Sequence, residues 1–291
     1  MKELIGTGVA LITPFKSDLS IDHEALATIV KYNISNGVNY LVISGTTGES
    51  VTITREEKTA ISQTVIAANN GRVPLVIGIG GSNTASVISE LKHTDLSEFS
   101  AILSVAPYYN KPTQEGFYQH FKEIAQSTDM PVILYNVPGR TAKNVDPATV
   151  LKLANNFENI VAVKEAGNNM DQYIELIKNK PTDFLVISGD DDLVLDVTLA
   201  GGAGVISVIG QAFPNEFSKM IKFGLEQNKD ASRALETRLM PLINLIFEEN
   251  NPAGIKAVFK HMGYCTDLVR LPLVPATAGL QSKIAAFIAQ F

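Results

Sequence analysis

Short apolar runs alternate with longer amphipathic segments along most of the chain. Eight runs of five or six residues, rich in valine, isoleucine and leucine, are typical of strands buried on both faces. They cover residues 8–13, 40–44, 74–78, 101–105, 131–135, 160–165, 184–188 and 204–208. Between them, apolar positions recur at the three- and four-residue spacing of helices. Because parallel neighbours need a crossover segment, this alternation predicts a mostly parallel sheet.

The number of units favours a closed barrel over an open sheet. Eight strand–helix units in roughly 220 residues match a (β/α)8 TIM barrel, although an open doubly wound sheet stays possible because closure leaves no mark in a sequence. From residue 214 the pattern is purely helical. Helices are expected over residues 216–227, 231–248, 252–261 and 276–290. We therefore predict an α/β fold with a barrel catalytic domain over residues 1–228 and a C-terminal helical domain over residues 229–291.

Composition and charge narrow the classes of function. With 45% hydrophobic and 19% charged residues, the chain can bury a large core. A net charge of −6 and the lack of a basic run argue against a nucleic-acid partner. One cysteine, Cys265, excludes an internal disulfide and fits a reducing compartment. No apolar segment is long enough to span a membrane, so we expect a cytoplasmic protein.

A lysine ends one of the apolar runs. Alternation along a strand places Lys164 on the same face as Ala162, and Glu165 on the opposite face. If that shared face looks into a barrel, burial disfavours the ammonium form, and a free amine can attack a ketone to form a Schiff base. The alternative is a lysine whose stem packs while its head reaches water or a distant carboxylate.

Other polar groups follow the predicted strands, where barrel enzymes place their chemistry. The hydroxyls and exposed amides of residues 44–50 suit a small carboxylate, or form a plain turn. Tyr135 can point inward beside Lys164 and move protons, or be a core residue. Arg140, in a Pro-Gly loop, can clamp a carboxylate or be solvated.

Several other polar residues carry weaker signals. The run at residues 189–192 can line a site or cap the next helix, and the pattern favours capping. The histidines lack metal-ligand spacing and are expected on helices as surface or packing residues: His23, His93, His120 and His261. Cys265 lies far from any strand end, so a thiol nucleophile is not expected.

Four motifs together resemble those of the dihydrodipicolinate synthase family. They span residues 45–50, 135–141, 163–166 and 204–208, and they occur in the family's order at predicted strand ends. The similarity covers essentially the whole chain. The family consists of (β/α)8 barrels with a C-terminal helical domain that form Schiff bases with pyruvate, so the resemblance implies this fold and this chemistry here.

The resemblance also implies roles for individual residues. Lys164 would form the imine, and Tyr135 would donate and accept protons in a hydroxyl relay completed by Thr46 and by Tyr109 of a neighbouring subunit. The expected substrate-binding residues are Thr47 and the backbone of Ile206 for the pyruvate carboxylate, Arg140 for the carboxylate of L-aspartate 4-semialdehyde, and Gly189. The implied product is 4-hydroxy-tetrahydrodipicolinate, on the route to diaminopimelate and lysine. Neither a metal nor an organic cofactor is implied, and a homo-oligomer, dimer or tetramer, is expected.

The resemblance leaves two alternative functions open, and the chain departs from lysine-inhibited family members in one region. Related family members cleave N-acetylneuraminate or keto-deoxy sugar acids, and a catalytically silent barrel could bind a ligand. Arg140 favours the synthase because it offers a fixed cation to a short acceptor. Lysine-inhibited members use polar and acidic side chains where this chain carries Arg55, Lys58 and Ser86, with no local acid expected, although Tyr108 is retained. We therefore expect inhibition by lysine to be weak or absent, and inhibition at sub-millimolar lysine would contradict this expectation.

Overall fold

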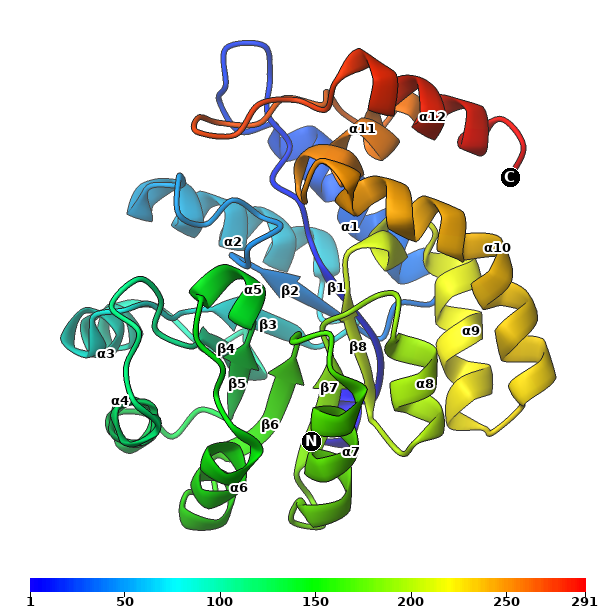
Figure 1. Ribbon diagram of the computed structural model, residues 1–291. Helices are drawn as coiled ribbons and strands as arrows, with labels where there is room; N and C mark the ends of the chain where they lie inside the picture. The colour runs from blue at the N-terminus through cyan, green and yellow to red at the C-terminus, as the bar shows by residue number, and fades with distance from the viewer.

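Eight parallel strands close into a barrel. In the computed structural model, which describes residues 1–291, the strands follow one another around the barrel in chain order. They are β1 (Gly6–Ala10), β2 (Tyr40–Ile43), β3 (Leu75–Gly78), β4 (Ala101–Val105), β5 (Val132–Asn136), β6 (Ile160–Glu165), β7 (Leu185–Ser188) and β8 (Gly204–Ser207). Pairing of β8 with β1 closes the ring (Figure 1). The predicted TIM barrel is confirmed, and the open sheet is excluded.

Helices surround the barrel (Figure 1). They are α1 (His23–Ser35), α2 (Arg55–Asn69), α3 (Thr84–His93), α4 (Gln114–Gln126), α5 (Pro138–Thr141), α6 (Pro147–Asn156), α7 (Met170–Asn179), α8 (Val194–Leu199), α9 (Pro214–Leu225), α10 (Lys229–Glu248), α11 (Ala253–His261) and α12 (Ala278–Ile288). Two short 3-10 helices cover Lys2–Leu4 and Ile209–Gln211. None of the helices is both long and apolar enough to cross a membrane.

Two apolar clusters form the core, and both follow from the alternation of side chains along the strands. The larger cluster fills the space between the barrel and its helices, and the smaller one fills the barrel interior. Ile133, Tyr135 and Ala162 belong to the interior cluster. Gly8 shows how tightly the interior is packed, because a Cβ at this position would lie 2.1 Å from the Tyr40 ring. The expected inward direction of the Tyr135 and Ala162 face is confirmed.

Local boundaries differ from the expectation where long-range contacts intervene. Asp22 caps α1, accepting a hydrogen bond from Ala25 N at 3.0 Å. The predicted capping by residues 190–192 is wrong, since α8 begins only at Val194 and its N-cap, Leu193, offers no side-chain oxygen. The predicted Pro-Gly loop around Arg140 is instead the single-turn helix α5. β1 begins two residues before the predicted run and leaves the sheet after Ala10.

The C-terminal helices lie against the barrel rather than apart from it. Helix α10 begins at Lys229 and packs along α9, and the segment after α11 reaches the loop between β1 and α1 (Figure 1). There Thr266 Oγ1 donates to Phe15 O at 2.7 Å. The division into domains at residue 228 remains a prediction, because α10 also covers the mouth of the barrel.

Candidate active site

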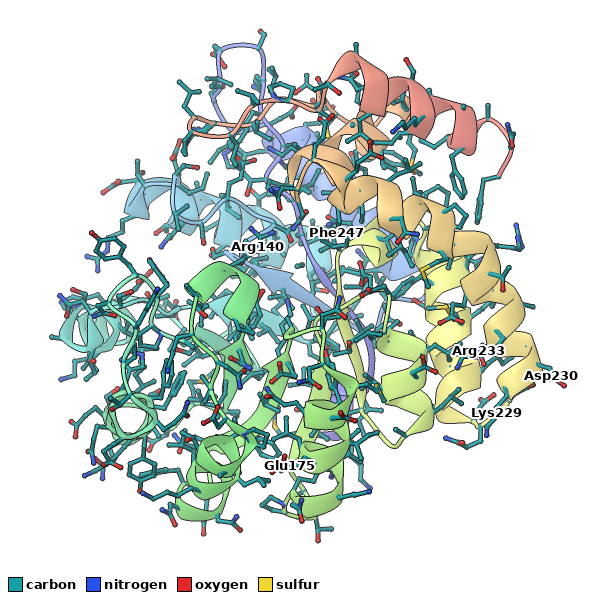
Figure 2. All side chains as sticks on the ribbon, in the orientation of Figure 1. Arg140, Glu175, Lys229, Asp230, Arg233 and Phe247 are labelled. Atoms are coloured by element: carbon teal, nitrogen blue, oxygen red, sulfur yellow. The ribbon has the colours of Figure 1, made fainter.

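A cavity of about 800 Å³ opens at the carboxyl ends of the strands. Six of the eight predicted site residues line this cavity, and they come from four different parts of the barrel. The lining includes Thr46, Thr47, Tyr135, Arg140, Lys164 and Gly189. Helix α10 adds the opposite wall, and Figure 2 shows its Phe247 near Arg140 of α5. The barrel therefore brings together residues that are up to 143 positions apart, from Thr46 to Gly189.

Lys164 and Tyr135 are direct neighbours on adjacent strands. The register of β5 and β6 pairs Tyr135 with Lys164, and Lys164 Nζ lies 4.4 Å from the centre of the Tyr135 ring. Only 6% of Lys164 is exposed, and no carboxylate lies within ion-pair distance of its nitrogen. Asp190 and Asp191 line the same cavity and act on Lys164 through their charge, but neither forms an ion pair with it. The arrangement suits an amine that reacts as a nucleophile beside a phenol.

Gly189 makes room for the lysine stem. A Cβ at Gly189 would lie 2.8 Å from Lys164 Cε and 2.7 Å from Ala166 Cβ, which is closer than real side chains approach. Gly189 N donates to Glu165 O at 2.6 Å, so β7 holds the end of β6 in place. Any larger residue would push the Lys164 side chain out of position.

Glu165 lies on the opposite face of β6 from Lys164, as predicted. Its carboxylate accepts hydrogen bonds from Asn136 Nδ2 at 2.9 Å and from Gln172 Nε2 at 2.8 Å. Burial raises the pKa of Glu165 to about 7. Glu165 thus ties β6 to β5 and α7 behind the site and does not pair with Lys164.

Three acidic residues that were expected to cap a helix, Asp190, Asp191 and Asp192, line the cavity instead. Asp191 is buried, and its Oδ2 accepts from Val208 N at 3.0 Å and from Ile209 N at 2.8 Å. Burial raises its pKa to about 6. Asp190 Oδ2 accepts from Asn168 N at 2.9 Å. The side chains of Asp190 and Asp191 therefore hold neighbouring loops in place. The sequence could not predict this, because a run of three aspartates does not indicate which backbone amides each carboxylate will bind.

The loop after β2 is held by the C-terminal helices. Thr47 Oγ1 accepts a hydrogen bond from Asn251 Nδ2 at 2.9 Å, and Glu49 forms an ion pair with Lys256 of α11 at 2.5 Å. Ser44 at φ 56° and Glu49 at φ 57° have left-handed backbones, which non-glycine residues rarely adopt. Sequence reasoning missed Asn251, Glu49 and Lys256, since no local pattern connects positions about 200 residues apart.

Two predicted site residues do not line the cavity of their own chain. Ile206 lies in the barrel interior with no exposed surface. Tyr109 is 93% exposed and has a left-handed backbone at φ 73°. No hydrogen bond joins the hydroxyls of Thr46, Tyr135 and Tyr109 within one chain. An outward-pointing Tyr109 is compatible with a contribution to another copy, and its role remains a prediction.

The region expected to repel lysine contains an acid after all. Lys58 of α2 pairs with Glu90 of α3 at 3.1 Å. The expectation that no local acid accompanies Arg55 and Lys58 was therefore wrong, because Glu90 lies 32 positions beyond Lys58 and the packing of α2 on α3 brings it close. Because Glu90 neutralises Lys58, only Arg55 is left as an unpaired cation that would disfavour lysine binding. Weak or absent inhibition by lysine stays a prediction.

Cys265 is not an activated nucleophile. Burial raises the pKa of its thiol to about 12, which keeps it protonated at neutral pH. The buried histidine, His120, has its pKa lowered to about 4 by burial and contacts Thr84 Oγ1 at 2.8 Å. The prediction that it is a packing residue agrees with its position on α4.

A buried lysine beside a tyrosine, at the carboxyl end of a closed eight-stranded barrel, defines a Schiff-base-forming barrel of the class I aldolase type. The family model described as "Dihydrodipicolinate synthetase family" matches residues 3–291. The chain belongs to this family, and it is a lyase.

Relatives and solved structures agree over nearly full length. The 4-hydroxy-tetrahydrodipicolinate synthase of Flavobacterium psychrophilum is 54% identical over 290 residues, covering 100% of this chain and 99% of that protein. The crystal structure of dihydrodipicolinate synthase from Aquifex aeolicus superimposes with a TM-score of 0.95 at 37% identity, covering 99% and 98% of the two chains. A chloride-inhibited dihydrodipicolinate synthase from Acinetobacter baumannii, in complex with pyruvate, has a TM-score of 0.95 at 34% identity and covers 98% of each chain.

Proposed function

We propose that this chain condenses pyruvate with L-aspartate 4-semialdehyde through an imine on Lys164, giving 4-hydroxy-tetrahydrodipicolinate. The names of the relatives give this product, and the reaction belongs to the diaminopimelate route to lysine. The observation that carries the proposal is Lys164 itself, buried without an ion pair and lying over Tyr135 in the cavity. A solved relative in complex with pyruvate supports the choice of the first substrate.

The chemistry needs an amine and a proton-transferring group beside it, and Lys164 and Tyr135 both line the cavity. The Lys164 amine attacks the ketone of pyruvate, water leaves, and an iminium forms. The iminium withdraws electrons from the adjacent methyl group, so loss of a proton gives an enamine. The enamine carbon attacks the aldehyde of the second substrate. The amine of that substrate then displaces Lys164 by transimination, which closes the ring and frees the enzyme.

Each remaining predicted residue has a place in this scheme. Thr47 and the backbone of Ile206 bind the pyruvate carboxylate, and Gly189 borders the same pocket. Arg140 binds the carboxylate of L-aspartate 4-semialdehyde from the rim. Tyr135 transfers protons at the imine, together with Thr46 and with Tyr109 of a second copy of the chain. The active form is accordingly a homo-oligomer.

The direct test is covalent capture. Borohydride reduces an imine irreversibly, so incubation with pyruvate and borohydride should add one pyruvate-derived group to the protein. Mass spectrometry of a digest should map this group to the peptide that contains Lys164. An adduct on another lysine, or none at all, would refute the assignment. A coupled assay with L-aspartate 4-semialdehyde, with N-acetylneuraminate as the comparison substrate, then separates the synthase from a sugar-acid lyase.

Tyr135→Phe should separate proton transfer from imine formation. The ring that lies beside Lys164 remains, but the hydroxyl is lost. We expect kcat to fall by about 10²- to 10⁴-fold, the usual contribution of a positioned acid–base group. The pyruvate concentration needed for half-maximal capture should change by less than about threefold, because the hydroxyl acts mainly after pyruvate binds.

Tyr40→Phe is the matched control, because Tyr40 is also buried in the barrel interior but its hydroxyl donates to Val205 O at 3.0 Å. This variant should retain its kcat. Equal losses of kcat and of pyruvate capture in Tyr135→Phe would argue against a role in proton transfer.

A further inference from the structure

Asn251 lies at the junction of the two parts of the site that bind carboxylates in the proposed reaction. It sits in the short connection between α10 and α11, is only 4% exposed and lines the cavity. Its side-chain Nδ2 donates to Thr47 Oγ1 at 2.9 Å. Its main-chain oxygen accepts from Arg140 Nη2 at 3.3 Å. One residue of the C-terminal helical segment thus contacts both Thr47 and Arg140.

The hydrogen bond to Thr47 determines what the threonine hydroxyl can do next. A hydroxyl has one proton and two lone pairs, whereas an amide NH₂ can only donate. Thr47 Oγ1 must therefore accept from Asn251, and this is the one hydrogen bond that its side chain makes in the structure. The hydroxyl proton of Thr47 remains free inside a cavity whose proposed occupant is a carboxylate.

The other side-chain atom of Asn251 fits the same picture. Asn251 Oδ1 is buried and has no hydrogen-bond partner in the structure. Buried amide oxygens are usually paired, and an unpaired one signals a role or a missing partner. The Asn251 amide is oriented with its NH₂ group, and not its oxygen, toward Thr47, and its oxygen is left unpaired.

We propose that Asn251 is a positioning residue for pyruvate: it donates to Thr47 and so directs the only proton of the threonine hydroxyl toward the carboxylate of the substrate. This inference rests on the proposed function, because it needs an anion at Thr47. It assigns to the C-terminal helical segment a part in the first binding step, through a side chain that does not itself have to touch the substrate.

Asn251→Asp is the sharpest variant, since the side chain keeps its shape but can no longer donate. A carboxylate only accepts, so Thr47 would donate its proton to the introduced carboxylate and have none left for the substrate. The half-saturating pyruvate concentration in borohydride capture should rise about 10- to 100-fold, as expected for losing a hydrogen bond to a charged group. Turnover at saturating pyruvate should fall much less.

Repeating the substitution in a Thr47→Val background isolates the path through the hydroxyl. If Asn251 acts through Thr47, then Asn251→Asp should shift the half-saturating pyruvate concentration by less than about threefold once the hydroxyl is gone. Equal fold-changes in both backgrounds would overturn the proposal. Asn250→Asp introduces the same charge at the adjacent exposed position, which also lines the cavity and whose side chain makes no hydrogen bond, so it measures the effect of the charge alone. Its shift should be clearly smaller than that of Asn251→Asp, and an equal shift would overturn the proposal.

A second variant keeps the test decisive if the new charge prevents folding. Asn251→Leu has a similar volume but neither donor nor acceptor, so the Thr47 proton is free to turn. The expected loss is about fivefold, smaller than for Asn251→Asp but above the threefold limit set for no effect. That loss should again vanish in the Thr47→Val background, and its persistence there would overturn the proposal. Melting temperatures confirm folding. Absence of any adduct at Lys164 in the unmodified protein would refute the proposed function itself, whereas capture that ignores Asn251 would refute only this inference.

Discussion

Replacing Lys164 with methionine is expected to abolish turnover and, at the same time, to raise the melting temperature. Turnover should fall by on the order of 10⁴-fold or more, as when a covalent nucleophile is removed, and borohydride should capture no pyruvate. Stability should rise because an unpaired amine is buried at this position and a methionine of similar length carries no charge to desolvate. A gain of about 1 kcal/mol corresponds to a shift of roughly 2 °C in a chain of this size.

Lys164→Arg is the matched control for this prediction. Arginine keeps a cation of similar reach but cannot form an imine, and it stays charged at any relevant pH. It should be as inactive as Lys164→Met without the gain in melting temperature. Circular dichroism during heating and the capture assay give both readouts. Pyruvate capture by either variant, or a lowered melting temperature in Lys164→Met, would contradict this account of the site.

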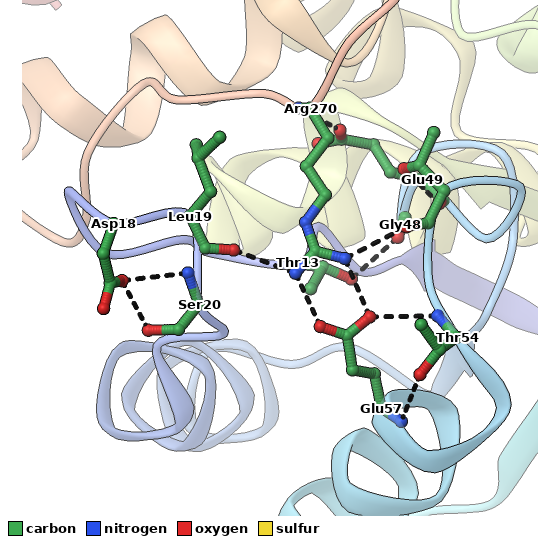
Figure 3. Close-up of polar contacts among 10 residues, drawn as sticks. Thr13, Asp18, Leu19, Ser20, Gly48, Glu49, Thr54, Glu57 and Arg270 are labelled. Atoms are coloured by element: carbon green, nitrogen blue, oxygen red, sulfur yellow. Dashed lines mark hydrogen bonds and ion pairs between the residues drawn. The ribbon is translucent and has the colours of Figure 1, made fainter.

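The second large effect concerns the ion pair behind the loop after β2. Lys256 and Glu49 are both buried and 2.5 Å apart, and Lys256 Nζ also donates to Leu268 O at 2.8 Å. Glu49 Oε2 accepts from Arg270 N at 2.9 Å, and the Arg270 guanidinium forms two hydrogen bonds with Glu57 (Figure 3). These contacts hold Glu49 in its left-handed backbone conformation, next to the threonines of the site.

Lys256→Met should therefore destabilise the protein by about 3–5 kcal/mol, because it leaves the Glu49 carboxylate buried without its cation. Adding Glu49→Gln should recover most of that loss, since the new amide is neutral and retains an oxygen for Arg270 N. Urea denaturation followed by circular dichroism measures both changes.

Lys260→Met is the control for the ion pair, one helical turn further along α11. Lys260 pairs with Asp267 at 2.9 Å, but its side chain is 44% exposed. Its loss should cost no more than about 1 kcal/mol, as is usual for surface pairs. Similar costs at both positions would show that burial does not distinguish the two pairs, and the proposed support of the loop would be wrong.

Local sequence patterns were sufficient for the alternation of strands and helices and for the neighbouring side chains of Tyr135 and Lys164. Side-chain alternation placed Tyr135 and Lys164 on inward faces of neighbouring strands, and the register of β5 and β6 confirms it. The inward direction of both side chains could be inferred because the alternation along a strand depends on only a few consecutive residues. The strands themselves were recognised from their apolar runs, although β1 is shifted and α5 was not expected.

The amino-acid sequence by itself determined the order of strands and helices, the inward face of each strand, and therefore the placement of Lys164 beside Tyr135. Only the tertiary structure decided that the barrel closes, that Asp191 binds the amides of Val208 and Ile209 rather than capping α8, and that Asn251 and Lys256 hold the loop of Thr47 and Glu49. The physical reason is the separation along the chain of the residues that determine each feature. Periodic burial is encoded within a single element, whereas a hydrogen bond between groups about 200 residues apart exists only after the packed elements bring them together.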